Sequence, residues 1–303
     1  MTRKDNPDYD IRLPEWKAED PWFTFSEEKR KTLLGGKFPW RVAPEDKKQP
    51  VHGKASTCDS LLNVYPDAIE VGAPAGSAEM VPMMVIFSVI SAIGCISLVY
   101  SGVVEFIKWG SIKSANDVAW LLISSVLAGA FANVSGFFFR IAFFTPRDIP
   151  VLFNRVTREV TFFPIVTARF WKFWQKPGVG PVRTYRWEDV RARSYKLTEF
   201  TGSAGRESYL LALLWGEESD PRQCKEIITI GYKGWWEDEL LWRLYEHIRR
   251  YMEEDGPPIQ PGETLRTSGF GKLPAFPPEV IAKAGGPALS PEEVMKLADQ
   301  AAT

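Results

Sequence analysis

The sequence contains few of the residues that usually carry out catalysis or hold a metal ion. It has two histidines, His52 and His247, and three isolated cysteines, none with the spacing of a zinc site or a disulfide framework. That cysteine usage fits a reducing compartment for the soluble parts of the chain. Its 37 basic and 38 acidic residues leave a net charge of −1, which argues against a general nucleic-acid-binding protein.

The motifs of common enzyme classes are also missing. The sequence has no Gly-x-Ser-x-Gly elbow, phosphate-binding loop, Rossmann glycine set or His-Glu-x-x-His. We expect His247 to lie on the surface, where nothing in the sequence indicates a nucleophile beside it. The adjacent Glu188 and Asp189 make a poor acid–base pair because neighbours in a strand point to opposite faces, whereas Trp187 and Val190 are expected to pack. We therefore predict no enzyme, no cofactor and no metal site.

Two long runs without charge stand near the middle of the chain. Val81–Val104 has 24 uncharged residues and Val118–Phe139 has 22. As helices they would be about 33–36 Å long, enough to cross a hydrocarbon core of about 30 Å. Only helices and closed barrels satisfy their backbone polar groups in lipid, so the runs predict a transmembrane helical hairpin within residues 79–144. Two buried helices of a soluble core are the alternative. The first run begins too far into the chain for a cleavable signal peptide.

Small residues recur every four positions in both runs, at Ser88 and Ala92 and at Ala128, Ala132 and Gly136. This spacing lets helix backbones approach closely in lipid, so it predicts packing of the two helices on each other and also allows a homo-oligomer.

The orientation of the hairpin is predicted from basic residues near its ends. The residues after the second run include four arginines, and the connection between the runs has two lysines: Arg140, Arg147, Arg155 and Arg158 against Lys108 and Lys113. The excess of basic residues predicts a multi-pass membrane protein with both termini in the cytoplasm. Trp109 and Trp120 are expected as aromatic anchors at the membrane interface.

The N-terminal residues 1–78 combine frequent proline with many aromatic side chains. The aromatic residues are Trp16, Trp22, Phe23, Phe25, Phe38 and Trp40. Because disordered segments are poor in aromatic residues, we expect an extended cytoplasmic arm that packs these side chains onto another part of the protein. A floppy tail is the alternative.

Residues 145–254 show short β-rich segments followed by a helix. Val151–Phe163 predicts two strands around a turn at 154–158, and further strands are expected at 182–187, 193–200, 209–215 and 226–232. An amphipathic helix is predicted over 235–252. The fold class is therefore an α+β membrane protein with a small antiparallel β-domain, similar to pleckstrin-homology domains in having a C-terminal helix as a cap.

The remaining residues 255–303 are rich in proline and glycine and predict a loose tail. One short helix is expected at its end, because Ser290 can act as an N-cap, Pro291 suits the first helical position and Glu293 completes a capping box.

One segment mixes cations and aromatic rings on both faces of a strand. Its residues are Arg169, Phe170, Trp171, Lys172, Phe173 and Trp174. Such mixtures suit the headgroup region of a membrane, and we expect lipid contact here. A strand whose aromatic rings cover the domain while its cations reach solvent is an equal alternative.

The segments Pro146–Pro150, Leu152–Val160 and Tyr185–Val190 resemble a bacterial family of unknown function. The resemblance covers about residues 80–252 and implies two membrane helices, a small β-rich domain and no catalytic residues. Several members of that family are met beside genes for polymorphic toxins or type VI secretion effectors, as immunity or accessory proteins. The resemblance therefore implies a non-enzymatic protein of a bacterial inner membrane that binds and neutralises a cognate secreted toxin. The alternative is a membrane-anchored sensor or scaffold whose pleckstrin-like domain binds lipid headgroups.

Overall fold

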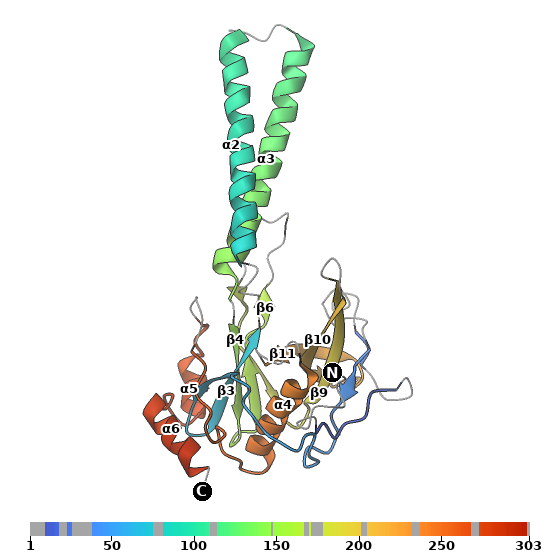
Figure 1. Ribbon diagram of the computed structural model, residues 1–303, viewed down its shortest axis with the longest axis vertical. Helices are drawn as coiled ribbons and strands as arrows, with labels where there is room; N and C mark the ends of the chain where they lie inside the picture. The colour runs from blue at the N-terminus through green and yellow to red at the C-terminus, as the bar shows by residue number, and fades with distance from the viewer. Residues whose placement is uncertain are drawn as a thin grey trace. The chain divides into compact units, whose positions relative to one another are not determined.

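The computed structural model describes most of the chain, and its secondary structure is drawn in Figure 1. The described residues are 10–17, 23–25, 38–74, 81–109, 114–146, 148–166, 170, 178–200, 205–231, 237–267 and 273–301. The chain divides into two compact units. The first unit comprises Met1–Pro74, Asp148–Pro164 and Pro181–Thr303, and the second comprises Ala75–Arg147 and Ile165–Gly180.

A five-stranded antiparallel sheet forms one layer of the first unit. Its strands, in spatial order, are β2 (Leu61–Val64), β3 (Ala68–Pro74), β4 (Asp148–Asn154), β5 (Glu159–Phe162) and β8 (Arg183–Arg186). The predicted turn between β4 and β5 is confirmed. The Asn154 side chain accepts hydrogen bonds from the Val156 and Thr157 N–H groups, and Arg158 adopts a left-handed φ of 58°. This is the local bonding that makes Asn a turn residue.

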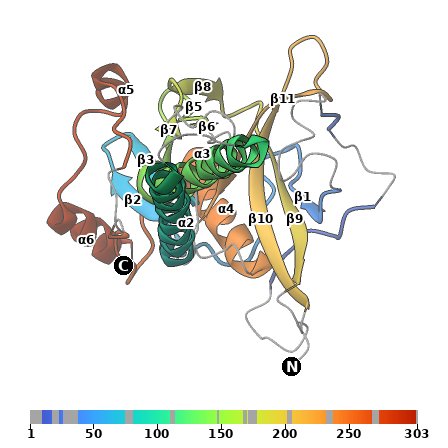
Figure 2. The same cartoon turned by 90° about the horizontal axis from the view of Figure 1, so that it is seen from above.

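A second antiparallel sheet lies across from the first, with a helix packed against both. The sheet has the order β1 (Arg41–Val42), β9 (Arg191–Phe200), β10 (Gly205–Gly216) and β11 (Cys224–Ile230). The helix α4 (Asp238–Glu253) packs against β10 and β4. In Figure 2, α4 lies on one side of β9 and β10, and β1 lies on the other. The strands and the helix predicted for residues 182–252 are thus confirmed to within a few residues.

The core between these layers is built from aromatic side chains. Phe162, Tyr185 and Trp215 stack on one another with ring-centroid distances of 5.2–5.8 Å. Trp187 packs against Phe153 at 6.1 Å and against Tyr245 of α4 at 6.2 Å. Because each large ring buries some 150–250 Å² and these pairs are stacked or edge-on, the cluster is a main source of the unit's stability.

Strands β2 and β3 were not expected, since residues 1–78 were predicted to be an extended arm. The prediction that arm aromatics pack is confirmed for Phe23 and Phe25, which are buried. Phe38 stacks on Trp16 at 5.2 Å but stays 59% exposed. Trp22 lies outside the described residues.

The C-terminal residues pack more closely than a loose tail. They form α5 (Pro278–Lys283) and α6 (Pro291–Gln300), and the capping box predicted at Ser290 is confirmed. Ile259 and Ala284 are fully buried. The Asn154 amide donates to the Lys283 carbonyl at 2.8 Å, which holds this segment on the five-stranded sheet. The high proline and glycine content predicted a loose tail, but composition could not predict the contact of this segment with Asn154 of the sheet.

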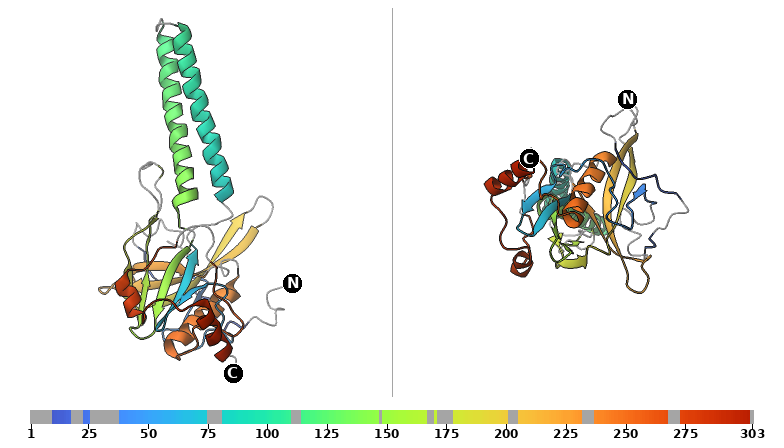
Figure 3. Two further views of the ribbon diagram at one scale, coloured as in Figure 1. Left: turned by 90° about the vertical axis from the view of Figure 1, so that its left-hand side faces the viewer. Right: turned by 90° about the horizontal axis from the view of Figure 1, so that it is seen from below.

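Two long antiparallel helices dominate the second unit. They are α2 (Val81–Trp109) and α3 (Ala115–Phe144), and they lie side by side in Figure 3. Helix α3 begins with a capping box in which Ser114 and Asp117 exchange hydrogen bonds. A two-stranded sheet of β6 (Ile165–Val166) and β7 (Gly178–Val179) belongs to the same unit. In the chain, α2 and α3 are inserted between the neighbouring strands β3 and β4, whose ends Pro74 and Asp148 are paired.

Candidate functional site

Two motifs of the sequence that lie apart in the chain meet beside α4. The Trp187 main-chain N–H donates to the Arg158 carbonyl at 2.9 Å, and the Trp187 indole N–H donates to Glu253 at 2.6 Å. The Arg158 guanidinium bridges Glu188 and Glu253, at 2.8 Å each. The expected packing of Trp187 is confirmed, since its side chain is fully buried. This cluster joins the β4–β5 turn to the end of α4.

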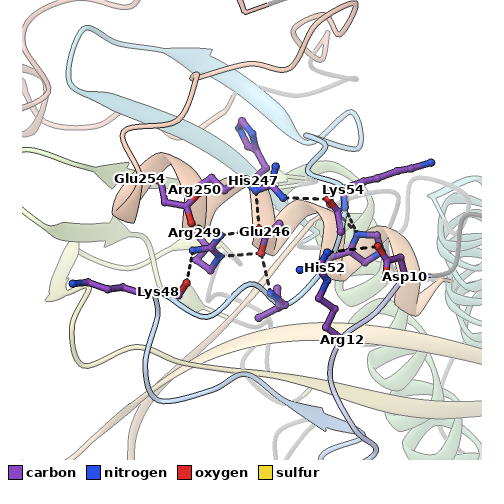
Figure 4. A network of polar contacts seen from close by, with 12 residues as sticks. Asp10, Arg12, Lys48, His52, Lys54, Glu246, His247, Arg249, Arg250 and Glu254 are labelled. Carbon is purple, nitrogen blue, oxygen red and sulfur yellow. Dashed lines mark hydrogen bonds and ion pairs between the residues drawn. The ribbon is translucent and has the colours of Figure 1, made fainter.

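The polar side of α4 is buried in a network of charged hydrogen bonds (Figure 4). Glu246 and Arg249 form a bidentate pair with two bonds of 2.8 and 2.9 Å, and both side chains are almost fully buried. Glu246 also accepts from Arg250 at 2.7 Å and from the Val51 N–H at 3.0 Å. Burial would raise the pKa of Glu246, but these hydrogen bonds hold it below its usual value. The carboxylate is therefore charged at neutral pH.

The same network binds residues 47–54 to helix α4. Arg249 donates to the Lys47 carbonyl at 3.2 Å, and Arg250 donates to the Gly53 carbonyl at 3.2 Å. His52 is fully buried; its Nε2 lies 2.8 Å from the Glu239 carboxylate, and its Nδ1 lies 2.9 Å from both the N–H and the carbonyl of Lys54. These bonds fix residues 47–54 against α4.

His247 is buried, and the prediction of a surface histidine is wrong. Its side chain is 0% exposed, and its Nδ1 accepts a hydrogen bond from the Gln260 amide at 3.0 Å. Burial lowers the pKa of His247 to about 4, so the ring is neutral at physiological pH. The sequence placed His247 beside charged neighbours, but the segment around Ile259 and Gln260 covers it, and nothing local to the helix indicates that cover.

The charged groups of Glu246, Arg249 and Arg250 are hydrogen-bonded to one another and to main-chain groups of the first unit. No three His, Cys, Asp or Glu side chains among the described residues are grouped so that they could hold a metal ion. Cys58 and Cys224 are buried free thiols, and burial raises the pKa of Cys58 to about 11, which keeps it protonated. The network of Glu246, Arg249 and Arg250 therefore has a structural role, holding residues 47–53 against α4.

The hairpin presents a large apolar surface. Helices α2 and α3 are long and apolar enough to cross a membrane by length and composition, over Val81–Lys108 and Ala115–Phe144. Large side chains along both helices are exposed, such as Ile96 at 67% and Leu122 at 62%. Exposed large apolar side chains gathered in this way mark a membrane or protein interaction surface.

Polar and small residues join the two helices. The Ser88 hydroxyl donates to the Ser135 carbonyl at 3.0 Å, and the Ser135 hydroxyl donates to the Ser88 carbonyl at 2.9 Å. Ser88 and Ala128 are buried in this interface as predicted. Ala132, however, is exposed, because steps of four residues advance by about 400° and drift away from the contact face. The predicted stripe is therefore wrong beyond Ala128.

The residues predicted to lie at a membrane interface are only partly described. Trp120 is exposed near the start of α3, and Trp109 ends α2. The Phe170 ring packs edge-on against Phe137 of α3 at 5.2 Å. The other members of that prediction lie outside the described residues, namely Arg169, Trp171, Lys172, Phe173 and Trp174. The prediction of lipid contact for all of them stays a prediction.

Comparison with known proteins gives one result. Residues 128–279 match a family model described as "Family of unknown function (DUF6708)". No curated protein and no solved structure matches the chain. The matched region runs from α3 through the β-sheets to the start of α5, and it includes the cluster of Arg158, Trp187 and Glu253. Because the match spans half of the 303 residues, the chain belongs to the DUF6708 family of unknown function.

Proposed function

We propose that the protein is a membrane-anchored binding protein in which α2 and α3 cross a lipid bilayer. One observation carries the proposal: two helices of 28 and 30 residues expose apolar side chains along their whole length. At 1.5 Å per residue they extend over about 42–45 Å, more than a hydrocarbon core of about 30 Å. Reciprocal Ser88–Ser135 bonds satisfy both hydroxyls inside the pair, as lipid requires.

The connectivity supports a hairpin whose two ends lie on one side of the membrane. The chain leaves the first unit at Pro74 and re-enters it at Asp148, and these residues are paired in register. Basic residues around the end of α3, among them Arg140 and Arg155, favour the cytoplasmic side of a bacterial inner membrane, with both termini in the cytoplasm.

The first unit supports a pleckstrin-homology-like fold. Strands β3, β4, β5 and β8 of one antiparallel sheet are followed in the chain by β9, β10 and β11 of the other, and α4 comes directly after β11. The Gly231 N–H donates to the Gly72 carbonyl at 3.1 Å, which connects the two sheets at one corner. Such folds act mainly as binding modules, although the fold alone does not define a function.

The partner we propose is a secreted toxin that this protein neutralises by binding, as an immunity protein. We base this choice of partner on the resemblance of Leu152–Val160 and Tyr185–Val190 to a bacterial family met beside toxin genes. The buried charges of α4 support a role without catalysis, since their carboxylates and guanidinium groups are engaged with one another. Binding would then use the exposed surface of the first unit.

Two experiments test the proposal. Membranes from cells that make the full chain are washed with alkaline carbonate, and the protein is expected to stay in the membrane until detergent is added. Replacing Ile96 and Ile123 with Arg, each costing about 2.5–3.5 kcal/mol near a helix centre, should reduce this retention. A full chain that stays soluble after cell breakage contradicts the anchor.

The immunity function is tested in the host strain. Deleting the gene should make the strain sensitive to its own siblings in a mixed culture, and the full chain should restore resistance. A deletion strain that competes as well as its parent, while the neighbouring toxin gene is expressed, contradicts the immunity function.

A further inference from the structure

Residues 23–25 are attached to the second sheet as a short added strand. The Thr24 N–H donates to the Arg222 carbonyl at 2.8 Å, and the Cys224 N–H donates to the Thr24 carbonyl at 2.9 Å. Thr24 and Gln223 form a parallel bridge next to the first residue of β11, the edge strand of this sheet. These bonds use only main-chain groups, so any extended segment could form them.

The side chains of this added strand give it specificity. Phe23 and Phe25 are two residues apart and therefore point to the same face of an extended chain, whereas Thr24 points away and is exposed. Both rings are buried, at 4% and 7% exposure, in one apolar cluster on the sheet. The cluster contains Tyr195, Leu197, Leu210, Ala212, Leu214 and Cys224. The Arg193 guanidinium lies 4.7 Å from the centre of the Phe23 ring.

This cluster lies on the face of the sheet opposite to α4. In β10 the residues Leu210, Ala212 and Leu214 alternate with Leu211 and Leu213, and the register pairs Leu210 with Tyr195 and Ala212 with Arg193. The sheet thus carries apolar residues on both faces. Helix α4 lies against one face, and among the residues described Phe23 and Phe25 supply the buried rings from outside the sheet on the other.

We propose that this face and the adjoining β11 edge form the surface that binds the protein partner. The partner would supply an extended segment with two aromatic side chains two positions apart, in place of residues 23–25. Main-chain bonds at a sheet edge with pockets for alternate side chains are the chemistry of strand-addition recognition. The assignment rests on the proposed function, because it requires that the protein acts by binding.

In this arrangement the arm competes with the partner. A surface that is free only a fraction of the time binds with an affinity reduced by that fraction. Removing the rings of Phe23 and Phe25 therefore raises the affinity for an added segment, and we expect an increase of at least about 10-fold.

The first experiment uses the full chain in detergent micelles and a fluorescent synthetic peptide. The peptide carries residues 20–28, Asp-Pro-Trp-Phe-Thr-Phe-Ser-Glu-Glu. A variant with Phe23→Ala and Phe25→Ala is expected to bind it at least about 10-fold more tightly than the wild type does. A peptide with both Phe replaced by Ala should bind neither protein. Thr24→Ala removes an exposed hydroxyl with a long hydrogen bond of 3.4 Å to the Arg222 carbonyl, so it is the control and should stay close to the wild type.

Two results of that titration overturn the proposal. One is a double variant that keeps the wild-type near-ultraviolet circular dichroism and yet fails to bind the peptide. The other is equal binding of the peptide that lacks both rings. Neither measurement involves membrane extraction or a toxin, so failure here leaves the membrane anchor and the immunity function to be judged by their own experiments.

A second measurement keeps the two rings in place. Neighbouring strands lie about 4.8 Å apart, so Thr24→Cys with Gln223→Cys is within disulfide reach. Oxidation should give a monomeric product, and an excess of the 20–28 peptide should slow it several-fold. An unchanged rate overturns the proposal, and so does a disulfide-linked dimer, which would make the arm of a second copy the occupant. The single Thr24→Cys variant controls for reaction with the native thiols.

Discussion

Asp148 and Arg266 form a buried ion pair of 2.6 Å between the first residue of β4 and the C-terminal segment. Burial raises the pKa of Asp148 to about 6, although the nearby Arg266 opposes the shift. The folded state thus binds more protons than the unfolded state between about pH 4 and 6, and the contribution of this carboxyl to stability decreases as the pH rises through that range.

Asp148→Asn tests this relationship. The wild-type free energy of unfolding, minus that of the variant, should fall by about 1–3 kcal/mol between pH 4 and pH 6.5. The loss of a partner for Arg266 lowers the free energy of unfolding of the variant by a constant amount. It does not change how the difference between the two proteins depends on pH. Urea unfolding in detergent at a series of pH values measures it, and parallel curves for the two proteins would show that the carboxyl does not titrate in this range.

His247→Gln should change the pH dependence in the opposite sense. Burial lowers the pKa of His247 to about 4, so the folded state binds fewer protons than the unfolded state between pH 4 and 6.5. The contribution of His247 to the free energy of unfolding is fully present above pH 6.5 and is lost as the pH falls toward 4. The stability difference between wild type and variant should thus shrink by up to about 3 kcal/mol on acidification to pH 4. The same urea series measures it, and a constant difference would contradict the prediction.

Glu246→Gln should destabilise the first unit strongly. It leaves the buried Arg249 without its main counter-charge, and breaking a buried pair in this way costs about 3–5 kcal/mol. Glu254→Gln is the matched control. It removes the other carboxylate at 2.8 Å from Arg249, but Glu254 is 50% exposed, and we expect a loss of at most about 1 kcal/mol. Thermal unfolding followed by tryptophan fluorescence compares them, and equal losses would contradict the burial argument.

Replacing Ser88 and Ser135 with Ala should weaken the association of α2 with α3. Each hydrogen bond between helices in lipid contributes about 0.6 kcal/mol on average, so the double variant should lose about 1–2 kcal/mol. Ser97→Ala, at an exposed position of α2, is the control and should have little effect. Unfolding in mixed micelles compares the variants, and no difference between them would argue against the serine pair as the helix contact.

Local patterns in the sequence were sufficient for much of this fold. The uncharged runs, the alternation in β4 and β5, and the spacing of Leu241, Leu244 and Ile248 each act within a few residues, and the elements they predict are present. Ser290 likewise carries its own capping signal. Such features depend on neighbours in the chain and can therefore be predicted without knowing the fold.

The features that were missed depend on distant partners. Strand β3 contains Gly72 and Pro74, a weak strand signal, and pairs with β4 only across the whole hairpin. Glu246 and Arg249 look like solvent-facing helix residues until residues 47–53 cover them. His247 is buried by Gln260 for the same reason. The binding face under Phe23 and Phe25 could not be predicted either, since only the sheet register brings its members together.

The position of the hairpin between β3 and β4 has a consequence for how the protein is made. β3 leaves the ribosome first, yet its neighbour in the sheet is translated only after both apolar helices have emerged. If α2 and α3 insert into a membrane as proposed, the edge of β3 stays unpaired while the helices pass to the insertion machinery. Under that proposal, folding of the five-stranded sheet is timed by insertion of the helices, and a delay in insertion leaves an aggregation-prone intermediate.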